Sequence, residues 1–354
     1  SNLCQEITLP TTPIQHIDDG EGEIALCILS AVNVGALNDL SELENICDLS
    51  VRALEQIIDY QDYPVKAAEV STKKRRSLGI GYIGLAHYLA KNGVKYSDPE
   101  AWTLVDRLTE AFQYHLLRAS CDIAMEKGKC EGFERTKYAD GLLPIDHYKK
   151  EVDEIVPHKQ RMAWESLRKD IAKHGLRHST LSAQMPSESS SVVSNETNGI
   201  EPPRALLAIK KSKKGPLKQI APGYPKLKND YTLLWEMPSN EGYINVVAMM
   251  QKYFDQAISG NWSYNPLQFE NNEVPLSAMA QDMLTAYKYG WKTSYYQNTY
   301  DFKGEDEDVQ PAGIGVVTED EGEDVILEPE NTVNGDDQIS TSAGEEGECE
   351  ACTI

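Results

Sequence analysis

The chain has 354 residues, 40% of them hydrophobic, with 34 Lys and Arg against 56 Asp and Glu and a formal charge of −22. Residues 301–354 hold 18 acidic residues and one basic residue, whereas residues 1–300 hold 38 and 33. A body this mildly acidic lacks the positive surface needed for nucleic acid, and no apolar run approaches the roughly 18 residues of a membrane span. The composition therefore argues against nucleic-acid binding and membrane insertion.

Cysteine usage indicates the redox compartment. Seven cysteines, an odd number, with no signal-peptide pattern in the given sequence, predict reduced thiols in the cytoplasm rather than a secreted disulfide framework. The chain opens with Ser1 rather than Met, and we interpret its start as the interior of something larger. A gene split, an excised insertion, processing or trimming would each produce such a start.

Hydrophobic patterning predicts helices alternating with short apolar runs, which favours an α/β fold. Residues 24–37 suit a buried strand running into a turn, and Ser41 with Glu44 forms a capping-box start for a helix that reaches Tyr60. Further helices are expected over 80–92, 99–127, 159–174, 241–258 and 276–290. The Ser-, Asn-, Gly- and Pro-rich stretch 179–203 is typical of a functional loop, and the composition from Asp301 onward predicts a disordered acidic tail.

Three polar residues near the start share a spacing of two. Asn2, Cys4 and Glu6 would lie on one face of an extended segment, where one reacting group could meet an amide, a thiol and a carboxylate together. Spacing alone favours a plainer interpretation, a loop with a buried cysteine and solvated neighbours.

Two cysteines end the acidic tail. Cys349 and Cys352 form C-x-x-C without further zinc ligands nearby, so a mobile dithiol is favoured over an inert tail. About 48 flexible residues reach roughly 38 Å, whereas a 300-residue body has a radius of gyration of about 19 Å. The tail could thus visit both an interior site and an external reductant.

Two further patterns remain open on sequence alone. The run Pro186, Ser187, Glu188, Ser189, Ser190 and Ser191 could open a helix whose unpaired N–H groups and hydroxyls bind an anion, or it could be an ordinary helix cap. Tyr295 and Tyr296 are adjacent, so a regular strand would point them to opposite faces, which favours core packing over a functional pair.

Two motifs resemble known sites without their context. Gly79–Gly84 reads G-x-G-x-x-G, but it follows a basic polar run rather than a buried strand, which argues against a dinucleotide site. His174 and His178 have helical spacing, yet Gly175 interrupts the helix between them. We expect an ordinary histidine pair and no metal site.

Several stretches together resemble one family, the C-terminal half of the large catalytic subunit of class I ribonucleotide reductase. They are SNLCQEI, GEIALCILSAVNVGALN, LPIDHYKK, HGLRHSTLSAQMPSESSSVVSNETNGIEPPR, LLWEMP, LTAYKYGWKTSYYQNT and the terminal CEAC. The resemblance covers residues 1–300 and the last few residues. It implies the second half of a ten-stranded α/β barrel that begins at the radical finger loop and carries a small inserted α/β subdomain, followed by the tail 301–354.

The resemblance assigns roles to individual residues. Cys4 corresponds to the thiyl-radical cysteine, Glu6 to the general base for the ribose 3′-hydroxyl, and Asn2 to the amide that holds the sugar. Cys27 corresponds to one of two barrel cysteines that supply reducing electrons. Pro186–Ser190 corresponds to the substrate diphosphate cradle.

The remaining implied roles concern electron supply. Tyr295 and Tyr296 resemble the stacked pair that relays the radical from the small subunit, and Cys349 and Cys352 resemble the tail pair that is reduced by thioredoxin or glutaredoxin. The C-x-x-C spacing is tighter than that of bacterial relatives, which leaves the preferred reductant open. Three other cysteines match no family motif and are interpreted as structural: Cys47, Cys121 and Cys130.

The resemblance also implies partners. The second barrel cysteine would lie upstream of Cys4, so we expect an obligate complex with a separate chain that carries the N-terminal half. A small subunit would hold the diiron-tyrosyl radical, the substrates would be ribonucleoside diphosphates, and this chain would bind no cofactor itself. The location would be the cytoplasm, or the host cytoplasm if the gene is phage-encoded. Two alternatives stay open, a non-catalytic fragment that binds or regulates the reductase and a free-standing thiol oxidoreductase that uses the tail dithiol.

Overall fold

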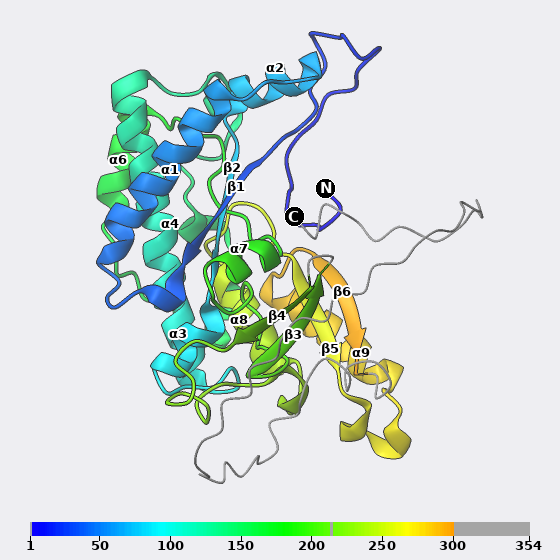
Figure 1. Ribbon diagram of the computed structural model, residues 1–354. Coiled ribbons are helices and arrows are strands. Elements are labelled where there is room, and N and C mark those ends of the chain that lie inside the picture. The colour runs from blue at the N-terminus through cyan, green and yellow to red at the C-terminus, as the bar shows by residue number, and fades with distance from the viewer. Residues whose placement is uncertain (1, 213–214, 301–354) are drawn as a thin grey trace, which may run out of the picture.

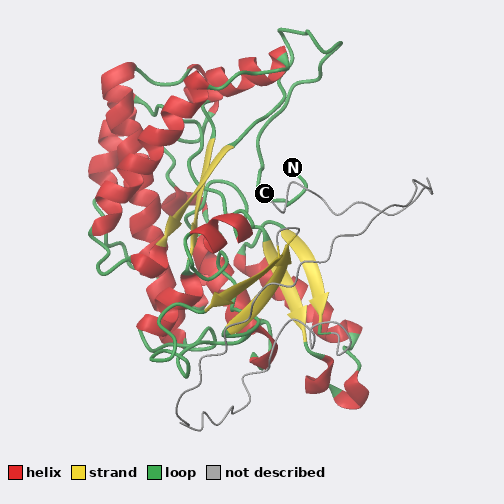
Figure 2. Ribbon diagram, viewed as in Figure 1, coloured by secondary structure: helices red, strands yellow, loops and turns green. Residues whose placement is uncertain are grey.

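A computed structural model describes residues 2–212 and 215–300 (Figure 1). The predicted acidic tail, with Cys349 and Cys352, lies outside the described residues. The expected mixed α/β class is confirmed, since helices and short strands share the described chain (Figure 2).

The strands form a ladder of parallel segments. Strand β1 (Ile28–Asn33) pairs in parallel with β2 (Leu78–Ile83), and β5 (Gly260–Tyr264) pairs in parallel with β6 (Ser294–Thr299). The extended segment 180–184 joins these two pairs, because parallel bridges link its residues to Ile80 on one side and to Ile258 on the other. The two strand pairs and the segment 180–184 therefore form one continuous parallel arrangement.

The helix predicted over 80–92 is wrong in its first half. Residues 78–83 are strand β2, and the helix α3 (Leu85–Lys91) begins only after Gly84, whose φ is +81°. Every residue of β2 is buried, so the strand lacks the polar and apolar alternation that would have distinguished it from a helix.

Helices cover one side of the β1–β2 pair (Figures 1 and 2). Helix α1 (Glu42–Tyr60) packs on α4 (Pro99–Lys127), and α4 packs on α6 (Trp164–His174) and α8 (Glu241–Gln251). The predicted bounds of α1 and α4 are confirmed to within one residue, although Ser41 makes no side-chain cap. Helices α6 and α8 are shorter than predicted, because 159–163 is not helical and the chain after Gln251 turns into the segment that leads to β5.

Other elements complete the described chain. Helix α9 (Leu276–Tyr289) matches its prediction, whereas α2 (Lys66–Arg75) was not predicted because its sequence is polar and basic. The antiparallel hairpin of β3 (Leu207–Ser212) and β4 (Gly215–Ile220) stands apart from the parallel ladder. The short helices are α5 (Pro144–His147), α7 (Glu188–Val193) and the 3-10 turns Val34–Ala36, Glu131–Arg135, Lys150–Glu154, Leu234–Glu236, Pro266–Gln268 and Glu270–Asn272.

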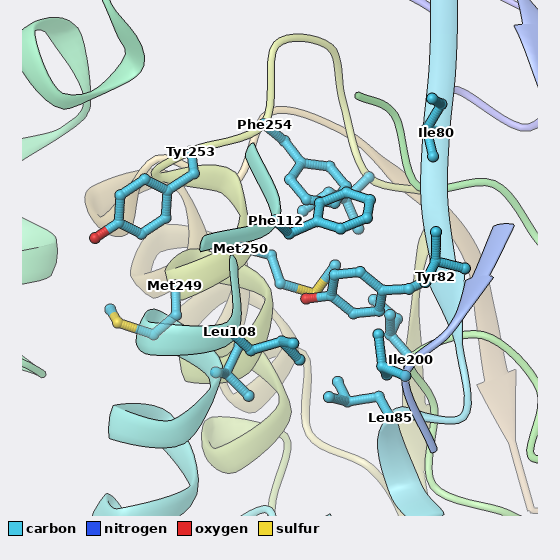
Figure 3. Packing of buried hydrophobic residues seen from close by; sticks show 14 of the residues in the cluster. Ile80, Tyr82, Leu85, Leu108, Phe112, Ile200, Met249, Met250, Tyr253 and Phe254 are labelled. Carbon is cyan, nitrogen blue, oxygen red and sulfur yellow. The ribbon is translucent and has the colours of Figure 1, made fainter. Parts of the chain in front are cut away.

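The core joins β2 to α4 and to the chain just after α8. Tyr82 meets the rings of Phe112 and Phe254 edge to face, with centroids 5.5 and 5.9 Å apart (Figure 3). Each such pair contributes about 0.5–1.5 kcal/mol beyond the area it buries. Cys47, Cys121 and Cys130 are also buried, in agreement with their structural interpretation. Among the described residues, none of the helices combines the length and the apolar character that a membrane crossing requires.

A buried ionic cluster ties α1 to the two loops beside the ladder. The Glu55 carboxylate accepts from Arg76 at 2.7 Å, Arg177 at 2.8 Å and His178 at 3.0 Å. Burial alone would raise the pKa of Glu55, but the hydrogen bonds from His178 and the two arginines lower it to about 2. His178 is therefore a satisfied core histidine, as the sequence suggested.

Candidate active site

The loop at the start of the chain is a turn rather than the extended segment predicted from its spacing. The Gln5 N–H donates to the Asn2 carbonyl at 3.2 Å, and Gln5 has a φ of +69°. The predicted two-residue alternation is therefore wrong. The turn nevertheless brings the Asn2 amide to the Glu6 carboxylate, since the two side chains are hydrogen-bonded.

Glu6 is the one buried carboxyl in this loop. It is 2% exposed, and its Oε2 atom has no hydrogen-bond partner among the described residues. Burial raises the pKa of Glu6 above its usual value, and the hydrogen bond from Asn2 opposes that rise. An oxygen left open in a buried site is suited to a hydroxyl group of a ligand.

Three contacts fix the loop to the ladder. The Ala257 N–H donates to the Glu6 carbonyl at 2.9 Å, the Thr293 hydroxyl donates to the Gln5 carbonyl at 3.0 Å, and the Thr8 N–H donates to Gln256 Oε1 at 3.2 Å. Because Thr293 lies two residues before Tyr295, the loop is anchored at the start of the strand that carries the tyrosines. None of these anchors was identified from the sequence, since each joins residues about 250 or more positions apart.

The Cys27 thiol lies beside Gln256 and close to Glu6. Gln256 Nε2 is 3.3 Å from Cys27 Sγ and also donates to the Leu78 carbonyl at 3.1 Å. Desolvation, opposed by the Gln256 hydrogen bond and aided by the Glu6 charge, raises the pKa of Cys27 to about 12. Cys27 is therefore a protonated thiol near neutral pH.

The glycine motif provides room for this thiol. Gly79 and Gly81 lie inside β2 rather than in a turn after a strand, and the basic run before them belongs to helix α2, so the motif lacks the preceding strand of a dinucleotide site, as the sequence indicated. A Cβ atom on Gly79 would lie 2.8 Å from Cys27 Sγ, and one on Gly81 would lie 2.7 Å from the Ala183 carbonyl. Neighbouring protein atoms thus fill the space beside both glycines, where a side chain would otherwise lie.

A β-bulge places the two tyrosines side by side. Gly260 pairs with Ser294 and Trp262 with Gln297, so one residue of β5 faces two residues of β6. The rings of Tyr295 and Tyr296 lie 3.8 Å apart between centroids, and their hydroxyls are 2.9 Å apart. The opposite-face geometry of a regular strand does not apply here, and Tyr296 is 51% exposed rather than packed in the core.

The tyrosines line a cavity of about 500 Å³ that also touches Pro186 and Glu188. Asn261, which lies opposite the bulge, accepts from the Tyr296 N–H at 3.0 Å and donates to the carboxyl of Glu201. Burial raises the pKa of Glu201 to about 7, against the opposing effect of Asn261.

The serine loop opens α7, as its sequence suggested. The Ser187 hydroxyl donates to the Met185 carbonyl at 3.1 Å, and the Ser190 hydroxyl donates to the Ser187 carbonyl at 3.2 Å. Both hydroxyl protons are donated to carbonyls within the loop. An anion here would therefore have to bind the N–H groups of the first helical turn, including that of Ser189. No group of three or more His, Cys, Asp or Glu side chains within residues 2–212 and 215–300 is arranged to hold a metal ion.

A buried carboxyl, a protonated thiol and a tyrosine pair thus lie along one parallel ladder of an α/β protein. Residues 1–229 and 223–297 match the family described as "Ribonucleotide reductase, barrel domain", and the chain belongs to this family.

Relatives extend the similarity. The chain is 58% identical over 301 residues to the ribonucleoside-diphosphate reductase subunit alpha of Haemophilus influenzae, across 85% of this chain and 40% of that protein. It is 54% identical to ribonucleoside-diphosphate reductase 1 subunit alpha of Escherichia coli, with the same coverage. It is 42% identical to the subunit alpha of Enterobacteria phage T4, over 87% of this chain and 40% of that protein. The chain thus spans about 40% of the length of these relatives.

Proposed function

We propose that this chain is the C-terminal catalytic part of a ribonucleoside-diphosphate reductase, which makes 2′-deoxyribonucleoside diphosphates for DNA synthesis by a thiyl-radical mechanism. The observation that carries the proposal is the anchored loop Asn2–Glu6, in which a buried carboxyl with an open oxygen lies close to Cys27. The parallel segments would form half of a ten-stranded barrel, and a separate chain carrying the N-terminal half would complete it. The acidic tail would form a second region beyond residue 300.

The proposed chemistry begins at Cys4. A thiyl radical on Cys4 takes the hydrogen from C3′ of the ribose, and the Glu6 carboxylate accepts the 3′-hydroxyl proton. The 2′-hydroxyl then leaves as water, and C2′ gains a hydrogen from the second of two barrel thiols. Glu6 returns its proton to the 3′-oxygen, and Cys4 finally returns a hydrogen to C3′. Asn2 keeps the carboxylate oriented through its hydrogen bond and can hold the sugar hydroxyls.

Cys27 is suited to supplying hydrogen in the reduction. Its pKa of about 12 keeps the sulfur protonated, so it can give a proton to the departing 2′-hydroxyl. Cys27 and a second cysteine on the N-terminal half together lose two electrons and form a disulfide. Closing that disulfide balances the two electrons that the sugar gains.

The tyrosine pair would supply the oxidising equivalent. Hydroxyls 2.9 Å apart allow a proton and an electron to pass between Tyr295 and Tyr296, and the exposed Tyr296 is the natural entry point from a small subunit that holds a diiron-tyrosyl radical. The substrate diphosphate would occupy the first turn of α7, at Pro186, Ser187, Glu188, Ser189 and Ser190.

The barrel disulfide would be reopened by the acidic tail. A thiolate of Cys349 or Cys352 attacks the disulfide, a mixed disulfide forms as one barrel thiolate leaves, and the second tail thiolate then closes the tail disulfide. Thioredoxin or glutaredoxin would reduce the tail pair again. The complex would work in the cytoplasm.

Replacing Cys4 by Ser tests the proposal. With the N-terminal half and small subunit present, deoxynucleotide formation should fall to background, whereas nucleoside diphosphate binding persists. Cys130→Ser is the matched control and should keep turnover. Normal turnover in the Cys4 variant would refute the mechanism, and disulfide reductase activity by this chain alone, without nucleotide reduction in the complex, would favour a thiol oxidoreductase.

Replacing Tyr295 or Tyr296 by Phe separates the catalytic role from a binding or regulatory one. Each variant removes only a hydroxyl, so substrate binding should be retained while turnover is lost. Retained turnover would remove the tyrosines from the proposed pathway.

A further inference from the structure

A second cavity, of about 560 Å³, shares no lining residue with the cavity that the tyrosines line. Its wall includes Thr180, which begins the extended segment 180–184, Asp255, which lies five residues before β5, and Lys292, which lies two residues before β6. Thr8, two residues beyond the Asn2–Glu6 loop, also lines it. The tyrosine cavity instead touches Pro186, which follows one of those segments. We call the second cavity the basic cavity, because of the charges described next.

Positive side chains dominate the wall of the basic cavity. Seven Lys, Arg and His residues line it, against one carboxylate, Asp255. Asp255 is already engaged, because its Oδ2 accepts from the Leu181 N–H at 2.7 Å and its other oxygen accepts from the Tyr138 hydroxyl. An anion entering the cavity would therefore meet no carboxylate that is free of hydrogen bonds.

Some of the cations have partners and others do not. Arg75 pairs with Glu23 at 2.6 Å, and Lys252 is fully buried between two aspartates. In contrast, Arg135 and Lys137 are exposed, and within the part of the chain that the structure describes no carboxylate oxygen lies within 4 Å of either. These two cations are available to a partner.

The titration of neighbouring groups agrees with a positive potential. Desolvation and the charge of Lys137 lower the pKa of His147, with Lys292 adding to the effect and Asp255 opposing it. Desolvation and Lys137 likewise lower the pKa of Lys292 to about 8, although Asp255 opposes the shift. A bound anion would relieve this crowding of cations.

The basic cavity is one side chain away from Cys27. The Thr8 N–H donates to Gln256 Oε1, and Gln256 Nε2 lies 3.4 Å from Thr180 Oγ1 and 3.3 Å from Cys27 Sγ. Gln256 thus separates the cavity from the thiol that is oxidised in the proposed reaction.

We propose that the basic cavity is the docking site for the chain's own acidic tail, and that residues 345–350 bind there beside Arg135 and Lys137. This stretch has four glutamates around Cys349, and residues 301–354 hold 18 acidic residues against one basic residue. The 48 residues between Tyr300 and Cys349 reach roughly 38 Å if they behave as a flexible chain. The inference rests on the proposed role of the tail dithiol and adds to it the place where the tail binds.

Carbodiimide cross-linking of the full chain tests the docking directly, because this reagent joins carboxylates to lysine amines without a spacer. We expect links from residues 345–350 to Lys137 to exceed those to Lys226 and Lys228, which are exposed in the turns after β4 and do not line the basic cavity. The preference should disappear in 1 M salt, where the screening length is about 3 Å. An even distribution of links over the exposed lysines would overturn the proposal.

A charge-reversal pair tests the consequence for turnover in the assembled enzyme. Arg135→Glu with Lys137→Glu should lower thioredoxin-supported turnover at least fivefold, whereas turnover supported by dithiothreitol, a small dithiol that needs no tail, should be unchanged. Lys226→Glu with Lys228→Glu makes the same change of charge and should alter neither rate. Unchanged thioredoxin-supported turnover in the Arg135 and Lys137 variant would refute the docking site.

Different results would refute the proposed function and the docking site. If the parent enzyme makes no deoxynucleotide with either reductant, the proposed function fails. If dithiothreitol supports turnover but the Arg135 and Lys137 variant still responds normally to thioredoxin, only the docking site fails. Retained dithiothreitol turnover in that variant also shows that it folds.

Discussion

Replacing Gln256 by Met should cost about 2–4 kcal/mol of unfolding free energy. Met keeps the length of the side chain but removes both its donor and its acceptor. The Thr8 N–H would lose its partner and the Leu78 carbonyl would keep only the longer contact from the Thr180 hydroxyl, at 3.5 Å. One unsatisfied buried group costs about 1–3 kcal/mol. The lower part of the summed range applies, because Thr8 is only partly buried.

Urea denaturation followed by circular dichroism measures this cost. Gln281→Met is the matched control, because Gln281 is exposed on α9 and, among the described residues, its side chain bonds only to Thr285. Its change should stay within about 0.5 kcal/mol. A loss below about 1 kcal/mol for the Gln256 variant would refute its role as the anchor between the loop and the ladder.

The same substitution has a chemical effect on Cys27. The Gln256 N–H favours the thiolate, so its removal should raise the pKa of Cys27 further and slow alkylation by iodoacetamide. Mass spectrometry of the Cys27 peptide resolves this thiol from the others. Alkylation at the parent rate would show that the contact does not affect the sulfur.

Three further substitutions probe other parts of the structure. Glu201→Gln should abolish a pH-dependent shift of the Tyr296 amide resonance, which in the parent should have a midpoint near 7, the pKa to which burial raises Glu201; a shift that persists in the variant would assign it to another group. Gly81→Ala should lower stability by about 1–3 kcal/mol, since its Cβ would meet a backbone carbonyl at 2.7 Å, whereas Gly20→Ala meets nothing within 4 Å and should be near neutral; equal thermal midpoints would contradict this. Glu55→Gln should lower the free energy of unfolding, measured by urea denaturation, by about 3–5 kcal/mol. Because the folded pKa of Glu55 is about 2, below its usual 4.5, its contribution is full above pH 5 and is lost as the pH falls toward 2, so a gap that does not narrow in acid would count against the ion pairs.

The helices were predictable wherever the pattern was local. Helix α4 begins at Pro99 and keeps an apolar face for its whole length, so its bounds follow from the sequence. Strand β2 was missed because burial on both sides erases alternation, and α2 was missed because its polar sequence carries almost no amphipathic signal.

The residues of the candidate site likewise fall into those that the sequence indicates and those that only tertiary contacts reveal. Sequence reasoning assigned roles to Cys4, Glu6 and Cys27 through the family resemblance, and these roles remain predictions. It did not identify Gln256 or Thr293, whose partners lie more than 200 residues away along the chain. Their importance comes from tertiary contacts that no local pattern encodes.

The bulge in β6 makes the geometry of the tyrosine pair tolerant of substitutions in the side chains around it. The two hydroxyl oxygens are close because the backbone pairing places both tyrosines opposite Asn261, and not because neighbouring side chains press the rings together. Sequence drift in the surrounding wall can therefore proceed without uncoupling the pair. A single-residue insertion or deletion between Ser294 and Gln297 would swing one phenol to the other side of the sheet.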